Sequence, residues 1–346
     1  MDKKVIFAVA GSGKTTYIIN SLSLNKRSLI ITYTIANFNN LARRISEKFD
    51  GVWPDNITLM TFFQFLYRFC CKPFLADDFK LHSIIYDQPP SYLVQSNDSY
   101  FITSSGYLYS NRISLFVEKQ GCLDDVKNRI ATYFDELIID EVQDIAGRDF
   151  NFLEHLLSTE VNMLFVGDFY QHTFDTSRDG NVNKSLFDCY DDYVEKFTKH
   201  DCVLDDYTLC KSWRCGREVC EFVTQNLSIQ ICSHRDDCSF VHFISDNNEI
   251  EQIIHNSSII KLHYKDSSKF GNDHKNWGET KGEDCFQDVC VLLNKTTMNA
   301  YKKNMLHDLP PSTRNKLYVA LTRAHGNVYL IDEKVANDLA FGAISL

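Results

Sequence analysis

Short runs of apolar, mostly β-branched residues recur along the chain, each bounded by polar residues or glycine. Such runs are typical of strands that are buried on both faces of a parallel sheet. Amphipathic patterns at Thr15–Leu22 and Ile35–Phe49 predict helices between the first three runs, which is the alternation of an α/β domain. In the first half of the chain the runs are Val5–Ala10, Leu29–Thr34, Ile57–Phe62, Leu137–Asp140 and Met163–Gly167.

A second set of runs follows in the C-terminal part, with helical patterns at Arg217–Leu227, Glu249–Asn256 and Thr313–Arg323. We therefore predict two α/β domains with parallel sheets, at residues 1–199 and 200–346. Between about residues 70 and 132 the alternation stops, which predicts a small insertion carried by the first domain. The predicted strands of the second domain are Tyr207–Lys211, Phe240–Ser245, Ile259–His263, Val289–Leu293 and Val328–Ile331.

Composition supports a folded protein of this size. The chain has 346 residues, of which 44% are hydrophobic, so two packed cores are expected and disorder is excluded. The formal net charge of −10 means that any nucleic-acid contact must be a local basic groove. Apolar runs stay well below the about 18 residues of a membrane span, so we expect a cytoplasmic protein with no membrane partner.

The 12 cysteines fit reduced thiols in such a compartment. One cluster leaves a metal site open as the alternative interpretation. Its members are Cys210, Cys215, Cys220, Cys232, His234 and Cys238.

The clearest chemical signal is a glycine-rich turn between the first predicted strand and the first predicted helix. Gly11, Ser12 and Gly13 free backbone N–H groups to face an anion, and the helix N-terminus favours negative charge. Lys14 then supplies a charge to the outer phosphates, and the hydroxyl of Thr15 supplies a ligand to Mg²⁺. Ala8 stands where this phosphate-loop pattern usually begins with glycine.

Two adjacent carboxylates end the buried run that precedes residue 141. Asp140 is placed to hold Mg²⁺ together with Thr15, and Glu141 to orient or deprotonate an attacking water. A pair of acids at a strand end is commonly only solvated, but together with the phosphate loop it predicts hydrolysis of a nucleoside triphosphate.

The run Asp140–Asp144 resembles motif II of superfamily 1 helicases of the UvrD/Rep/PcrA type, and further motifs follow in the family's order from about residue 5 to 331. The resemblance implies two RecA-like P-loop domains, with ATP hydrolysed at the cleft between them. The other segments that carry it are Thr32–Asn37 (motif Ia), Thr61–Phe63 (Ib), Val166–Gln171 (III), Ser212–Arg214 (IV), Thr280–Asp284 (V) and Tyr318–Ala324 (VI).

The resemblance also implies roles for single residues. In catalysis, Glu141 would act as the base, Gln171 would sense the γ-phosphate, and Arg214 and Arg323 would be arginine fingers. The nucleotide would be held by Gly11, Ser12, Gly13, Lys14, Thr15 and Thr16, with Trp213 on the base and Asp284 on the ribose. Contacts to nucleic acid would come from Tyr33, Asn37, Thr61, Phe63 and Lys281.

Several alternatives remain open at this level. Arg323 is also compatible with a surface cation, and Tyr33 and Phe63 with core packing. The family usually has histidine at the position of Phe63, and its aromatic stacker after motif III falls near Thr176, with Phe174 as a substitute. The phosphate loop predicts a triphosphate, whereas the adenine base is implied only by the resemblance.

The predicted function is an ATP-dependent translocase or helicase on single-stranded DNA, with RNA not excluded. Only about 65 residues separate Arg214 from Lys281, so the family's large insertion is absent and a partner protein that supplies unwinding or regulation is expected. The alternative is a nucleotide-dependent regulatory or sensor ATPase that works within a complex, for instance in phage conflict, without productive unwinding. A small-molecule kinase would not need Arg214 and Arg323.

Overall fold

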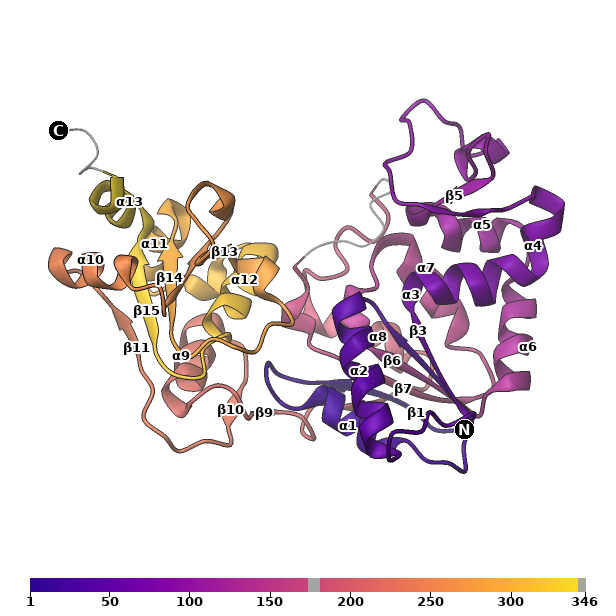
Figure 1. Cartoon of the computed structure of the whole chain (residues 1–346), viewed down its shortest axis with the longest axis horizontal. Helices are drawn as coiled ribbons and strands as arrows, with labels where there is room; N and C mark the ends of the chain where they lie inside the picture. The colour runs from indigo at the N-terminus through magenta and orange to yellow at the C-terminus, as the bar shows by residue number, and fades with distance from the viewer. Residues whose placement is uncertain (174–180, 342–346) are drawn as a thin grey trace. The chain divides into compact units, whose positions relative to one another are not determined.

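A computed structural model describes residues 1–173 and 181–341 (Figure 1). The chain separates into two compact units, which are described one at a time. The first unit contains residues 1–7, 14–167 and 181–205. The second contains residues 8–13, 168–173 and 206–341. Within the described residues, no helix has the length and apolar character that crossing a bilayer requires.

The first unit is built on a six-stranded sheet in which every neighbouring pair is parallel. Strands β2 and β6 are buried along their whole length, as expected for continuous apolar runs covered on both faces. The strand order is β3-β2-β6-β7-β1-β8. The strands are β1 (Lys3–Phe7), β2 (Ser28–Thr32), β3 (Ile57–Thr61), β6 (Glu136–Asp140), β7 (Asn162–Gly167) and β8 (Val203–Asp205).

Helices connect these parallel strands. Helix α2 begins after Thr34, whose side chain accepts a hydrogen bond from the Asn37 amide and so caps the helix. The helices are α1 (Lys14–Ser21), α2 (Ile35–Lys48), α6 (Leu123–Tyr133), α7 (Gly147–Leu156) and α8 (Tyr190–Thr198). The α/β fold class with parallel sheets is thus confirmed.

Residues 62–119, between β3 and α6, form a group of short elements outside the six-stranded sheet. Its core is aromatic: Phe79 and Phe101 both pack against Phe116 of α5, with ring centroids 5.0 and 5.3 Å away. Its two short strands pair in parallel with each other (Figure 1). The elements are α3 (Phe62–Gln64), a π-helical turn η1 (Phe65–Cys71), α4 (Lys72–Phe79), β4 (Ser83–Ile85), η2 (Asp98–Tyr100), β5 (Tyr107–Tyr109), η3 (Ser110–Arg112) and α5 (Ile113–Lys119).

The second unit contains a five-stranded sheet, again parallel throughout, in the order β11-β15-β14-β12-β13. Trp277 and Tyr318 are fully buried in its core. The strands are β11 (Val241–Phe243), β12 (Ile260–His263), β13 (His274–Asn276), β14 (Val289–Leu293) and β15 (Val328–Asp332). The helices are α9 (Arg217–Leu227), α10 (Asn247–His255), α11 (Lys295–Lys302), α12 (Pro311–Leu321) and α13 (Glu333–Phe341).

Two predicted strands differ from the structure for one physical reason. The first strand ends at Phe7, because the amides of Val9 and Ala10 bond to the carbonyl of Leu209 and the hydroxyl of Tyr318 instead of to a sheet neighbour. These residues are buried in the core of the second unit, so their apolar pattern continues although the strand does not.

The predicted strand Tyr207–Lys211 is wrong for the same reason, since Leu209 bonds to Val9. Only a two-residue strand follows it, β9 (Lys211–Ser212), which pairs with β10 (Cys232–Ser233).

Candidate nucleotide-binding and hydrolysis site

The turn after β1 has the backbone that a phosphate loop requires. Gly11 and Gly13 have φ angles of +69° and +90°, which residues with a side chain rarely adopt. A Cβ on Gly11 would also lie 2.6 Å from the Cβ of Arg214 and 2.8 Å from the Oγ of Ser212. Helix α1 then begins at Lys14, so its first N–H groups are available to an anion.

The predicted hydroxyls of this segment differ in their surroundings. Thr15 is half-buried in the first turn of α1, whereas Thr16 is exposed. The hydroxyl of Thr16 accepts a hydrogen bond from Arg44 of α2 at 2.8 Å. The Ser12 hydroxyl is buried and has no hydrogen-bond partner. Ser12 is therefore a further polar group in the loop that a bound ligand can satisfy.

The carboxylates at the end of β6 lie beside the lysine of the loop. Glu141 has a φ of +55°, and its Oε1 lies 3.6 Å from the Nζ of Lys14. Its other carboxylate oxygen accepts a hydrogen bond from the side chain of Gln143. Two elements of the first unit thus fix the Glu141 carboxylate next to the lysine that is predicted to meet the outer phosphates.

Asp140 is a buried carboxylate at the end of β6. Burial, and next the charge of Glu141, raise the pKa of Asp140 to about 7, while Lys14 opposes the shift. Its Oδ1 is buried and has no hydrogen-bond partner. A carboxylate oxygen of this kind fits Mg²⁺, with Thr15 as the second protein ligand.

The protein alone does not build a complete cation site. Among residues 1–173 and 181–341, no three His, Cys, Asp or Glu side chains come together in a way that could hold a metal ion. This includes the cysteine cluster that left a metal site open, where Cys215 and Cys220 are buried and Cys232 and Cys238 exposed. Mg²⁺ at Asp140 would thus need phosphate oxygens as further ligands, as is usual for this ion.

Asp168 and Gln171 of motif III are joined in a buried hydrogen-bond network. Asp168 caps the short helix η5 (Phe169–Gln171), and its Oδ2 accepts the side-chain N–H of Gln171 at 2.8 Å. The same oxygen accepts the hydroxyl of Tyr318 at 3.0 Å, and that hydroxyl accepts the amide of Ala10 at 2.8 Å. The predicted γ-phosphate sensor is thus linked to the phosphate loop.

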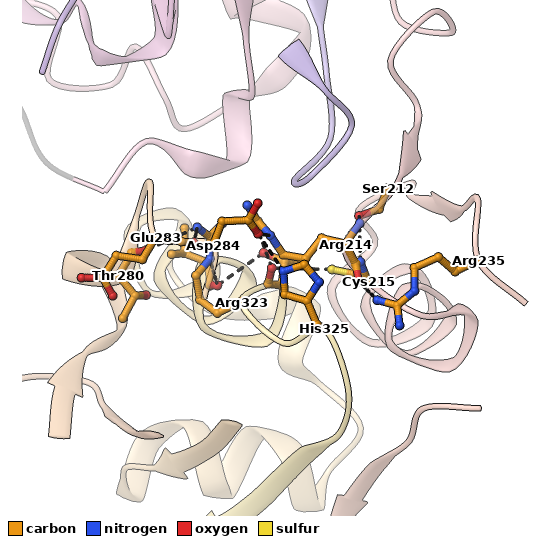
Figure 2. Close-up of polar contacts among 11 residues, drawn as sticks. Ser212, Arg214, Cys215, Arg235, Thr280, Glu283, Asp284, Arg323 and His325 are labelled. Carbon is orange, nitrogen blue, oxygen red and sulfur yellow. Dashed lines mark hydrogen bonds and ion pairs between the residues drawn. The ribbon is translucent and has the colours of Figure 1, made fainter. Parts of the chain in front are cut away.

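Arg214 and Asp284, for which the resemblance implies separate roles, form an ion pair (Figure 2). The Nε of Arg214 lies 2.5 Å from Asp284 Oδ1, and His325 approaches the same oxygen at 2.9 Å. Burial acts to raise the pKa of Asp284, but the hydrogen bond and charge of Arg214, with His325, hold it below its ordinary value. Asp284 itself remains largely exposed.

Arg323 is not a surface cation, because it is only 1% exposed. Its guanidinium donates to the backbone carbonyls of Val319, Thr280 and Glu283 (Figure 2). Its Nη2 has no hydrogen-bond partner among the residues that the structure describes. Burial, and next the charge of Arg214, lower its pKa to about 10. No carboxylate of the described residues forms an ion pair with it. A buried guanidinium in this state attracts an anion.

Trp213 is 62% exposed, as a side chain that receives a nucleobase must be. Its indole stacks on the imidazole of His234, with centroids 3.8 Å apart and an interplanar angle of 13°. Its amide donates to the carbonyl of Gly11 at 2.8 Å. Sequence reasoning missed His234 as part of this platform, and no local pattern connects the two residues.

The candidates for nucleic-acid contact fall into two groups. Tyr33 and Phe63 follow the ends of β2 and β3, and their ring centroids lie 5.8 Å apart. The ring of Phe63 also makes an edge contact with that of Tyr86, with centroids 5.4 Å apart. Tyr86 is mostly exposed and was missed, because nothing in its sequence context marks it. Tyr33 is buried enough that the pKa of its hydroxyl is raised. Its ring therefore also contributes to packing.

The remaining candidates include residues with local structural roles. Thr61 caps α3 through reciprocal hydrogen bonds with Gln64, and the amide of Asn37 donates to Thr34. Lys281 belongs to the second unit. The expected stacker near Thr176, with Phe174, lies outside the described residues.

Two protein-family models match the chain. The model of an AAA domain matches residues 2–175, and the model of the viral superfamily 1 RNA helicase core domain matches residues 117–332. No curated protein is significantly similar to the chain in sequence.

Similar solved structures include the helicase of PRRSV, with 13% identity over 96% of this chain and 52% of that one, and a TM-score of 0.49. A second is the arterivirus nonstructural protein 10 (helicase) in complex with DNA, with 15% identity over 98% of this chain and 63% of that one, and a TM-score of 0.49. The chain thus spans about half to two thirds of the length of these proteins.

Proposed function

The chain belongs to the family of the viral superfamily 1 RNA helicase core domain, and from this we propose that it hydrolyses a nucleoside triphosphate to move along single-stranded nucleic acid. The observation that carries the proposal is the Lys14–Glu141 pair next to Asp140, whose buried Oδ1 has no hydrogen-bond partner among the described residues. This combination supports the proposal that Lys14 binds phosphate, Asp140 holds the metal ion and Glu141 acts as the base.

The proposed chemistry assigns one task to each group. Lys14 and the amides of the loop bind the β- and γ-phosphates. Asp140 and Thr15 hold Mg²⁺, which when bound neutralises phosphate charge. Glu141 takes the proton of the attacking water, whereas Gln171 positions that water against the γ-phosphate.

Arg214 and Arg323 are proposed to stabilise the charge that develops on the γ-phosphate oxygens. Arg323 supports this best, because its Nη2 already lacks a partner in the folded chain. The ion pair with Asp284 keeps Arg214 in place until the nucleotide binds, and Asp284 in turn is proposed to meet the ribose. Trp213 is proposed to carry the base, with ATP as the nucleotide.

The proposed nucleic-acid substrate is single-stranded DNA, which the resemblance to UvrD-type motifs favours. The name of the matching family instead points to RNA. Aromatic faces give sequence-tolerant binding, because every base can stack on them. Tyr33, Phe63 and Tyr86 form such a group of rings. Asn37, Thr61 and Lys281 are proposed as polar contacts, and a partner protein as the source of duplex unwinding.

The deciding experiment is NTP hydrolysis by the purified chain without nucleic acid, with single-stranded DNA, with single-stranded RNA and with duplex DNA. We expect a basal rate that single-stranded DNA raises at least about 10-fold, and loss of all activity in Lys14→Ala. Lys48→Ala is the matched control, because the ammonium of Lys48 donates to backbone carbonyls at the end of α1 and lies over the Phe49 ring, away from the phosphate loop. Stimulation by RNA alone would identify RNA as the nucleic-acid substrate.

Hydrolysis that neither DNA nor RNA stimulates would contradict a motor and favour a regulatory ATPase. Absence of hydrolysis under every condition would contradict both.

A further inference from the structure

Tyr318 is a fully buried tyrosine whose hydroxyl serves two distant segments. It lies on α12, five residues before Arg323, and its side chain reaches the phosphate loop and motif III at the same time. We propose that Tyr318 is a positioning residue, whose hydroxyl ties the Ala10 amide to the Asp168 carboxylate and thereby holds Gln171 in the orientation that hydrolysis requires. This inference rests on the proposed hydrolysis of a nucleoside triphosphate.

Asp168 determines the orientation of the Gln171 side-chain amide. The donors to Asp168 include the Tyr170 amide at 3.1 Å on Oδ1, and the Gln171 side chain at 2.8 Å and the Tyr318 hydroxyl at 3.0 Å on Oδ2. An ionised carboxylate can only accept hydrogen bonds. The nitrogen of the Gln171 amide must therefore face Asp168, which leaves its carbonyl oxygen free to accept a hydrogen from water.

The two hydrogen bonds of the Tyr318 hydroxyl have a fixed direction. A phenol has one hydrogen to donate, and the only group that can take it here is Asp168, because the amide of Ala10 is itself a donor. The hydroxyl oxygen then accepts from Ala10 at 2.8 Å. Burial and the charge of Asp168 raise the pKa of Tyr318 well above its ordinary value, so the phenol stays protonated and keeps this polarity.

The hydroxyl of Tyr318 connects the phosphate loop to the carboxylate of Asp168. Ala10 directly precedes Gly11, the first residue of the loop with a left-handed backbone, and is itself fully buried. A change in the position of the loop when phosphate binds is passed through one hydroxyl to the carboxylate that orients Gln171. Removal of the hydroxyl would take its partner from the Ala10 amide and one donor from Asp168. Gln171 could then turn while the packing of the ring is kept.

Tyr318→Phe tests this link, because it removes only the oxygen. For nucleic-acid-stimulated NTP hydrolysis we expect kcat to fall about 10-fold while KM changes less than about 2-fold, since orientation of the water is lost and nucleotide binding is not. Tyr301→Phe is the matched control, a partly buried tyrosine of the same unit that stacks on Phe243. Its kcat should equal that of the unmodified chain.

A double-mutant cycle separates positioning from mere stability. In a Gln171→Ala background, Tyr318→Phe should change kcat less than about 2-fold, because the group that it positions is already absent. An equal loss in both backgrounds, an unchanged kcat of Tyr318→Phe, or a rise in KM alone would each overturn the inference.

If Tyr318→Phe does not fold, Asp168→Asn tests the same connection. An amide at this position lets Gln171 bond through either of its ends, so a similar loss of kcat is expected and an unchanged kcat overturns the inference. If the unmodified chain hydrolyses no nucleotide, the proposed function fails and this inference fails with it. If it is active and the variants match it, only the role of Tyr318 is wrong.

Discussion

The acidic end of β6 in the first unit and the guanidinium of Arg323 in the second unit are opposite in charge and alike in physical state. Asp140 is a buried carboxylate whose pKa is raised to about 7, mainly by burial, and one of its oxygens has no partner. Arg323 is a buried guanidinium whose pKa is lowered to about 10 by burial, and one of its nitrogens has no partner. Among the described residues, each of the two groups thus keeps one polar atom without a hydrogen-bond partner.

Such groups are costly, because a buried charge is normally paired or fully hydrogen-bonded. The carboxylate requires a cation and the guanidinium requires an anion. We propose that Mg²⁺ supplies the cation to Asp140 and that a phosphate group of the nucleotide supplies the anion to Arg323. By comparison, the charge of Arg214 is already neutralised by its ion pair with Asp284.

The largest effect is expected at Glu141, which tests whether the acidic site does more than hold a cation. Glu141→Gln keeps the shape of the side chain but cannot take a proton, so kcat for NTP hydrolysis should fall about 10³-fold with little change in nucleotide affinity. Single-turnover hydrolysis and equilibrium binding of the nucleotide measure the two quantities. Glu47→Gln on α2, which removes an exposed ion pair with Arg43, is the control and should keep the normal rate. A loss of affinity equal to the loss of rate would show that Glu141 only binds.

The next effect concerns Arg323, the other half of the comparison. Arg323→Ala should lower kcat about 10²-fold while nucleotide binding changes little, because its charge acts on the transition state. Arg217→Ala serves as the control, since Arg217 of the same unit is exposed and paired with Glu221. Equal losses of binding and turnover would mean that Arg323 is structural, and would break the proposed symmetry between the two buried charges.

The two charged sites also differ in how far the sequence predicts them. The acidic site is local: Lys14 follows a strand, and Asp140 and Glu141 end another, and parallel strands bring such ends to one edge of a sheet. The superfamily 1 assignment made from these motifs is confirmed. The finer UvrD type remains a prediction, as do the roles of the single residues.

The guanidinium site depends on tertiary contacts that no local pattern contains. Two of the hydrogen bonds of Arg323 go to backbone carbonyls about 40 residues away, and Asp284 meets Arg214 at a separation of 70 residues. The roles of His325, His234 and Tyr318 could therefore not be predicted. The same cause misplaced the end of the first strand, since Ala10 is buried by Tyr318 and not by a sheet.

A smaller effect is expected at Trp213, which asks whether the second unit contacts the base as well as the phosphates. Trp213→Ala should raise KM for ATP about 5-fold with kcat nearly unchanged, because stacking contributes about 0.5–1.5 kcal/mol beyond burial. His234→Ala should raise KM by less, since it only supports one face of the indole. The same KM for Trp213→Ala and the unmodified chain would mean that the base is held elsewhere.

The smallest effect is on stability, and it separates a carboxylate that binds a cation from one that is merely buried. Asp140 and Asp149 both have a pKa of about 7 because of burial, and each has one buried oxygen without a hydrogen-bond partner among the described residues. The other oxygen of Asp149 accepts a hydrogen bond from Ser114 at 2.6 Å. A raised pKa means that the folded state holds its proton more tightly than the unfolded chain does. Each carboxylate therefore weakens the fold as the pH rises from about 4 to about 7, and the penalty persists above that.

Asp140→Asn and Asp149→Asn should each raise the Tm of the ligand-free chain at pH 8 by about 3 °C and leave it unchanged at pH 4. Addition of Mg²⁺ and a non-hydrolysable ATP analogue distinguishes the two variants. The stabilisation by Mg²⁺ should persist in Asp149→Asn and disappear in Asp140→Asn, because the unpartnered oxygen of Asp140, unlike that of Asp149, belongs to a carboxylate next to Glu141 and Lys14. Equal retention in both variants would show that the charge of Asp140 is not what the cation neutralises.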